Sequence, residues 1–156
     1  GGDPEQWWLL ASDAGYGFLV RTNDLLANKK AGKAVLALPK GARVLPPVPV
    51  QAPETDRIVA VTSEGRMLVI TAADLPALAR GKGNKIIGIP AALAQRGDEV
   101  MAVVASVPEG GRLKLFSGKR HLVLKAADLN AYEGERGRRG NKLPRGFQKV
   151  DRAELD

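Results

Sequence analysis

Three short stretches of the chain combine lysine or arginine with glycine, a combination suited to binding phosphate groups. They are residues 29–33 (KKAGK), 80–85 (RGKGNK) and 136–142 (RGRRGNK), called here the first, second and third basic loops. Glycine lets the backbone pass close to a phosphate, and the cationic side chains neutralise it and release counterions. One such stretch is usually a solvated turn, but three in register predict a surface for a polyanion.

The predicted phosphate contacts are the basic side chains of these loops and of two neighbouring turns. They are Lys29, Lys30, Lys33, Arg80, Lys82, Lys85, Lys119, Arg120, Arg136, Arg138, Arg139, Lys142 and Arg145. For the turn that holds Lys119 and Arg120, ordinary hairpin solvation remains an equal alternative. Lys40 and Arg43 are interpreted as plain surface.

The residue types needed for catalysis are scarce. His121 is the only histidine and falls in an apparent strand, so we expect a structural or surface role for it. Tyr16 and Tyr132 have no neighbouring group that would activate them, and no carboxylate pair stands out as an acid and base couple. Cysteine is absent, no metal-ligand spacing occurs, and the second basic loop lacks the phosphate-binding-loop frame. We therefore expect no catalytic residue and no metal site in this chain.

The overall composition fits a basic, folded chain. It has 24 Lys and Arg against 17 Asp and Glu, a net charge of +7, and 44% hydrophobic residues. A positive field favours DNA, RNA or an anionic membrane surface, and the hydrophobic content allows a buried core. No apolar stretch reaches the ~18 residues of a membrane span. The lack of cysteine fits a reducing cytoplasm, and residues 1–6 are interpreted as a linker or domain edge.

A repeat of about 50 residues runs through the chain. Gly15 and Gly65 are 50 residues apart, as are the pairs Asp24-Leu25 and Asp74-Leu75. A looser third copy carries Asp128-Leu129, with extra residues in its polar stretches. Loops accept such insertions at little cost in stability.

Each copy is predicted to form short strands. Residues 8–11 and 18–21, and likewise 58–62 and 67–70, are predicted hairpins around a glycine turn. Residues 86–89 are predicted as a further strand, and residues 100–104 as the first strand of the third copy. Short helical turns are expected at residues 72–78, where Pro76 limits the length, and at 91–95. Trp7-Trp8 opens a strand, and core packing is the favoured role.

Several short strands per ~50 residues predict an all-β fold of propeller-like blades. The expected blades are residues 7–50, 51–97 and 98–156. One blade cannot bury its apolar face alone, but stacked neighbours can.

Four runs of the sequence resemble a known family. Residues 11–18 (ASDAGYGF), 31–34 (AGKA), 81–87 (GKGNKII) and 134–140 (GERGRRG) are similar to the C-terminal domain of bacterial type IIA topoisomerase A subunits, of the topoisomerase IV (ParC) type. The resemblance implies a β-pinwheel, a disc whose blades exchange strands and whose basic rim binds and bends duplex DNA. It also implies a bacterial cytoplasmic, nucleoid-associated protein. Its partners would be the catalytic core and the ATPase subunit of a heterotetramer, and ATP and Mg²⁺ would act in other domains.

Two departures from the family limit what can be carried over. The related gyrase A domain has a Q-R-R-G-G-K-G box, which residues 80–83 and 138–140 match only in degenerate form; this favours topoisomerase IV over gyrase-type wrapping. The family's disc also has more blades than three. The chain is therefore expected to be the last part of the domain, an incomplete disc with exposed blade edges.

The sequence thus predicts a non-catalytic module that binds and bends duplex DNA through phosphate contacts and presents it for strand passage in decatenation and supercoil relaxation. Two alternatives remain open at this point. One is a protein-interaction propeller whose basic loops dock acidic partners or the enzyme core. The other is a self-contained enzyme, against which the missing catalytic residues speak.

Overall fold

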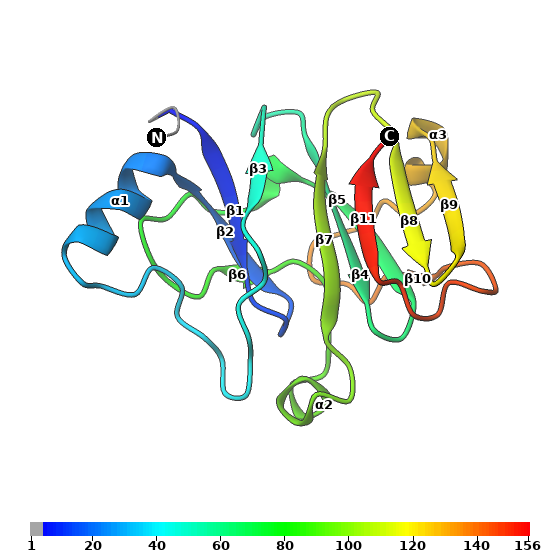
Figure 1. Ribbon diagram of the computed structural model, residues 1–156, viewed down its shortest axis with the longest axis horizontal. Coiled ribbons are helices and arrows are strands. Elements are labelled where there is room, and N and C mark those ends of the chain that lie inside the picture. Colours follow the sequence, from blue (N-terminus) through cyan, green and yellow to red (C-terminus); the bar gives the residue numbers. More distant parts are fainter. Residues whose placement is uncertain (1–4) are drawn as a thin grey trace.

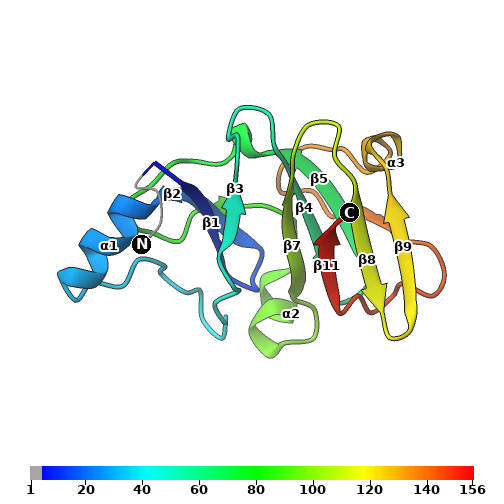
Figure 2. The ribbon, with the colours of Figure 1, turned by 45° about the horizontal axis from the view of Figure 1, so that its top comes forward.

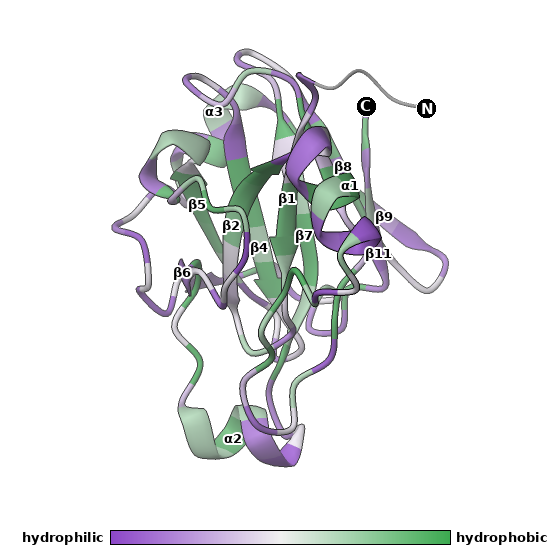
Figure 3. Cartoon of the chain, turned by 90° about the vertical axis from the view of Figure 1, so that its left-hand side faces the viewer, coloured by the Kyte–Doolittle hydropathy of each residue, from purple (hydrophilic) through white to green (hydrophobic). Residues whose placement is uncertain are grey.

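The computed structural model describes residues 5–156, so residues 1–4 of the predicted linker lie outside the described part. Three antiparallel sheets stand side by side along the molecule, with short helices at its margins (Figure 1). Figure 3 shows the central strands coloured as hydrophobic and the peripheral loops largely as hydrophilic. No helix among residues 5–156 is long and apolar enough to cross a membrane.

The first sheet has the strand order β3-β1-β2-β6. Its central hairpin consists of β1 (Trp7–Ala11) and β2 (Tyr16–Arg21), with β3 (Val48–Val50) beside β1 and β6 (Asn84–Lys85) beside β2. The predicted hairpin is confirmed. Strand β6, however, comes from the chain beyond the second hairpin.

The second sheet repeats this arrangement in the order β10-β5-β4-β7. Its hairpin consists of β4 (Arg57–Thr62) and β5 (Arg66–Thr71), flanked by β7 (Met101–Val107) and β10 (Asn141–Lys142). The sequence predicted residues 100–104 as the first strand of the third repeat. The structure instead pairs β7 with β4, so this strand belongs to the second sheet. Strand β7 instead occupies the edge position that β3 has in the first sheet.

The third sheet contains β11 (Arg152–Leu155), β8 (Leu113–Ser117) and β9 (Arg120–Leu124), in that order. The hairpin of the third repeat is therefore β8–β9. In the part of the chain that is described, no strand covers the outer edge of β9, and the three sheets do not close into a ring.

Short helices follow each hairpin at the Asp-Leu pairs of the repeat. They are α1 (Thr22–Lys30), the 3-10 turn η1 (Ala72–Asp74) and α3 (Ala126–Asn130). A fourth helix, α2 (Ala91–Arg96), ends at Gly97, which adopts a left-handed conformation. The predicted helical turns at residues 72–78 and 91–95 are thus confirmed, the former only in its first three residues.

The predicted strand at residues 86–89 is wrong, because the paired residues are Asn84 and Lys85 just before it. Ile86, Ile87 and Ile89 are instead buried in irregular backbone. Gly83 makes this possible: its φ is +81°, and a Cβ there would collide with the backbone of Gly17. The three isoleucines therefore pack in the core without forming a strand.

Two hydrophobic cores lie between neighbouring sheets. In β4, Ile58 and Ala60 pack in the core shared with the first sheet, while Val59 and Val61 pack in the core shared with the third. Alternate residues of a strand face opposite sides, so the second sheet is buried on both faces. Each sheet therefore depends on its neighbour for burial, as expected of stacked blades.

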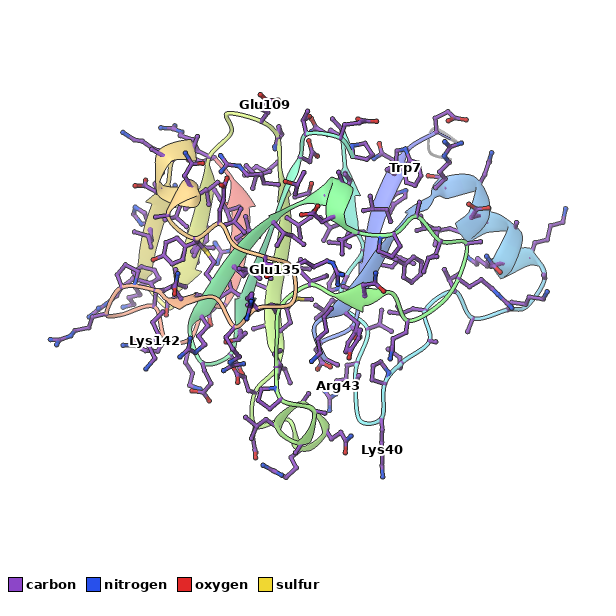
Figure 4. The ribbon with its side chains drawn as sticks, turned by 180° about the vertical axis from the view of Figure 1, so that it is seen from behind. Trp7, Lys40, Arg43, Glu109, Glu135 and Lys142 are labelled. Atoms are coloured by element: carbon purple, nitrogen blue, oxygen red, sulfur yellow. The ribbon has the colours of Figure 1, made fainter. Side chains whose placement is uncertain are left out.

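The edge strands β3, β7 and β11 lie next to one another on one side of the molecule (Figures 1 and 2). They line a largely apolar groove of about 390 Å³ that contains none of the predicted phosphate contacts. The segments that carry the second and third basic loops lie on the opposite side, seen in Figure 4.

Candidate nucleic-acid interface

The first basic loop continues from the C-terminal turn of α1. Cationic side chains are favourable there because the helix macrodipole is negative at its C-terminus. Lys29, Lys30 and Lys33 are all exposed, and none has an ion pair with a described residue. The last turn of α1 and the residues just after it thus carry three cations that are available to a polyanion.

The second basic loop leads into β6. Arg80 and Lys82 are exposed, and Lys85 is half-buried in the strand itself. The Lys82 ammonium lies 4.6 Å from the centre of the Tyr16 ring, a cation–π contact that holds this side chain beside the first sheet. Within the described residues, none of the three cations is neutralised by a carboxylate.

The three arginines of the third basic loop have different surroundings. Arg138 is exposed and forms an ion pair of 3.2 Å with Glu135, which is equally exposed. Arg136 donates a hydrogen bond of 2.9 Å to the carbonyl oxygen of Lys85. Arg139 donates to the carbonyl oxygen of Gly88 and to both carboxylate oxygens of Glu99. Only Arg138 of these three therefore presents its guanidinium group largely to solvent.

The remaining predicted contacts lie around the β8–β9 turn and the strand β10. Lys119, Arg120, Lys142 and Arg145 are exposed and have no ion pair in the described chain. The Arg120 guanidinium lies against Gly146, next to Arg145 in sequence. This turn thus adjoins the segment that follows the third basic loop.

Backbone hydrogen bonds join the second and third basic loops to the residues that follow the loop before each of them. In the first junction, where the second loop lies against residues 35–37, Gly81 donates to Val35 and accepts from Ala37. In the second junction, where the third loop lies against residues 86–88, Gly137 donates to Ile86, and Gly88 donates to Arg138. Residues 35–37 and 86–88 each follow closely after a basic loop. The loops therefore succeed one another in register, as the repeat predicts.

The tyrosines do not form a catalytic arrangement. Burial raises the pKa of the Tyr132 phenol above its usual value, and the Asp128 carboxylate raises it further. The phenol is thus held in its protonated, weakly nucleophilic form. Tyr16 lies under the Lys82 ammonium, and the described residues hold no cluster of three or more acidic or histidine side chains that could bind a metal ion.

Sequence reasoning did not identify Glu99. Its side chain is only 2% exposed, and it is the acidic partner of Arg139. The sequence around residue 99 does not indicate that Glu99 pairs with Arg139, because the two residues are 40 positions apart and meet only in the folded chain. A charged residue beside the apolar strand β7 was the only available signal.

The comparisons with known proteins agree with this architecture. The family described as "DNA gyrase C-terminal domain, beta-propeller" matches residues 6–51 and 56–106. The chain belongs to this family. The predicted resemblance and the all-β, pinwheel-like fold class are thereby confirmed.

Similar proteins place the chain nearer to topoisomerase IV. It is 53% identical over 154 residues to the A subunit of DNA topoisomerase 4 from Pseudomonas aeruginosa and 47% identical over 152 residues to that from Escherichia coli. These matches cover 99% and 97% of this chain but only 20% of each relative, so the chain spans about a fifth of their length.

The structural neighbours give the same order. The structure of the E. coli ParC C-terminal domain matches with a TM-score of 0.89 and 46% identity, covering 99% of this chain and 62% of that one. A DNA gyrase A C-terminal domain matches with a TM-score of 0.76 and 18% identity, covering 99% of this chain and 50% of that one; this likeness shows the fold alone.

Proposed function

We propose that this chain is a duplex-DNA-binding and bending module of a bacterial topoisomerase IV, which contacts phosphates with little base readout. One observation supports the proposal: three basic loops follow one another in register, and backbone hydrogen bonds join the second and third loops to the segment that follows the preceding loop. All 13 predicted contacts except Arg136, Arg138 and Arg139 have neither an ion pair nor a side-chain hydrogen bond within the described residues. Such a row of free cations can follow a phosphate backbone and release its counterions.

The wider role follows from the relatives, which are named as A subunits of DNA topoisomerase 4. The module would present a duplex for strand passage in decatenation and supercoil relaxation, within a heterotetramer formed with the catalytic core and the ATPase subunit. Catalysis, ATP and Mg²⁺ would belong to other parts of that enzyme. The site of action would be the nucleoid in the bacterial cytoplasm.

The test is the salt dependence of affinity for a labelled duplex of mixed sequence. Replacing Arg80 and Lys82 with alanine should weaken binding to all sequences alike and flatten the slope of log K against log salt by about 0.9 for each lost contact. Arg112→Ala is the matched control, because Arg112 is an exposed arginine that is paired with Asp156 outside the basic loops. An unchanged slope in the double variant would remove the second loop from the interface.

The same measurement separates the protein-docking alternative. A module that docks acidic proteins through its basic loops would leave the duplex unbound at moderate salt, whereas the proposed module binds it. A relaxation assay on this chain alone should show no activity, because the proposal assigns it no catalytic step.

A further inference from the structure

The second junction contains a set of side-chain contacts that the first junction lacks among the described residues. Alongside the two backbone hydrogen bonds, Arg136 reaches the carbonyl oxygen of Lys85 at 2.9 Å, and Arg139 reaches that of Gly88 at 2.6 Å. The segment with Glu135 passes beside the segment of β6 near the middle of the molecule (Figure 4). Two arginines of the third loop therefore bind the backbone at the end of the second loop and in the segment that follows it.

Arg139 also binds a buried carboxylate group. Glu99 accepts hydrogen bonds from Arg139 at 2.8 and 3.0 Å, one to each carboxylate oxygen, and its side chain is 2% exposed. A buried carboxylate requires a cationic partner, because an unpaired charge away from water is strongly unfavourable. Glu99 immediately precedes the segment that enters β7 of the second sheet. The Arg139–Glu99 pair thus holds the third loop, which leads into β10, to the segment that enters β7 of the same sheet.

The backbones approach each other closely at this junction. A Cβ on Gly88 would lie 2.5 Å from the carbonyl oxygen of Gly137. The corresponding residue of the first junction is Ala37, which carries a Cβ already and is exposed. Beside the first junction, the Asn28 side-chain amide donates a hydrogen bond of 3.1 Å to the carbonyl oxygen of Ala79, but no side-chain hydrogen bond from Arg80 or Lys82 to residues 35–37 occurs among the described contacts.

We propose that the Arg139–Glu99 pair, with Arg136, is a lock that fixes the first and second sheets relative to each other, because β6 of the first sheet precedes the bonded carbonyl groups and the third loop leads into β10 of the second sheet. Arg136 and Arg139 are then positioning residues and not phosphate contacts, whereas Arg138 stays available to a ligand. The lock sets the angle at which the duplex path turns between the second and third basic loops. This last consequence rests on the proposed DNA-binding function, but the lock itself does not.

The first experiment needs no DNA. Hydrogen exchange of the Gly88 and Gly137 amides is followed by NMR in this chain and in the double variant Glu99→Gln, Arg139→Gln, which leaves no unpaired buried charge. Both amides should exchange roughly tenfold faster or more, because charge-assisted hydrogen bonds no longer hold the junction. The Gly81 and Ala37 amides of the first junction serve as internal controls and should not change. Equal exchange of Gly88 and Gly137 in the two proteins overturns the lock.

The second experiment measures bending. A duplex with a fluorophore at each end is saturated with each protein, and energy transfer reports its end-to-end distance. The double variant should give a different or broader distance distribution, while Arg138→Ala should lower affinity and leave the distance at saturation unchanged. An altered exchange with an unaltered distance overturns the consequence for DNA. If the unmodified chain does not bind the duplex, the proposed function is contradicted. The lock is then tested by the hydrogen-exchange experiment alone.

Discussion

The first and second junctions use the same backbone ladder but differ in what their basic side chains do. In the first junction, Arg80 has no ion pair among the described residues, and Lys82 rests on Tyr16. In the second, Arg136 and Arg139 are engaged by contacts to Lys85, Gly88 and Glu99. The second and third basic loops have similar compositions but different roles. The second loop leaves its charges available, whereas two arginines of the third loop hold two sheets together.

A basic residue in a repeated motif therefore has no fixed role. The backbone position recurs with the repeat, since loops in equivalent positions form equivalent hydrogen bonds. Whether an arginine binds a ligand or a neighbouring blade depends on what the next blade supplies. Here the deciding group is the Glu99 carboxylate, which has no counterpart at the first junction in the described chain.

The largest expected effect is on stability. Arg139→Ala leaves the Glu99 carboxylate buried without a cation and should cost about 2–3 kcal/mol in the free energy of unfolding. The value is set below that of a fully buried pair because the Arg139 side chain is 41% exposed. Arg80→Ala, at the first junction, should change stability by less than about 0.5 kcal/mol. Urea unfolding of both variants makes the comparison, and equal losses would remove the distinction between the junctions.

The next effect comes from the backbone approach. Gly88→Ala places a methyl group against the Gly137 carbonyl oxygen and should cost about 2 kcal/mol through overpacking. Ala37→Gly at the equivalent position should cost less than about 1 kcal/mol, from the added freedom of the unfolded chain. Thermal unfolding followed by circular dichroism measures both. A tolerated Gly88→Ala would mean that the second junction is looser than described.

A third prediction compares DNA binding of the arginines. Arg138→Ala should flatten the salt slope by up to about 0.9, because its exposed ion pair with Glu135 does not withhold it from a phosphate. Arg136→Ala should leave the slope unchanged, because its guanidinium is bonded to the Lys85 carbonyl oxygen. Fluorescence anisotropy across a salt series distinguishes them. The reverse order would assign Arg136 to the interface.

The smallest effect concerns Tyr132, which lies just after α3. Its carbonyl oxygen accepts a hydrogen bond from the backbone N–H of Val69 in β5 of the second sheet. Its pKa is raised on folding, so its contribution to stability is present below the unfolded pKa of about 10 and is lost as the pH rises through the folded pKa. Tyr132→Phe should reduce the loss of stability between about pH 9 and about pH 11. Urea unfolding at the two pH values tests this, and an identical loss in the variant would show that the phenol does not contribute.

Local structure could be predicted from the sequence where it depends on local signals. The first two hairpins follow from short apolar runs around Gly15 and Gly65, and short helical turns were predicted at residues 72–78 and 91–95, whereas α1 and α3 were not. Strand pairing between repeats could not be predicted in this way. Asn84-Lys85 is a polar pair with little strand propensity, and it becomes a strand only because β2 offers a free edge. Residues 86–89 have the stronger propensity, but their side chains are needed in the core.

The candidate site shows the same limit. The positions of the basic residues followed from the repeat, and the structure leaves all but three of them without an ion pair or a side-chain hydrogen bond among residues 5–156. The roles of Arg136 and Arg139 could not be read from the sequence, because their partners lie about 40 to 50 residues away. The sequence therefore predicts where charge accumulates and not which charges are already in use.

The most direct test of a DNA-binding surface is a titration of the isotopically labelled chain with a short duplex, followed through its backbone amide NMR signals. We expect the shifts to concentrate in residues 29–33, 80–85 and 136–145 and in the β8–β9 turn, and to shrink together as salt is raised. Shifts confined to the apolar groove of β3, β7 and β11, or no shifts at moderate salt, would contradict it.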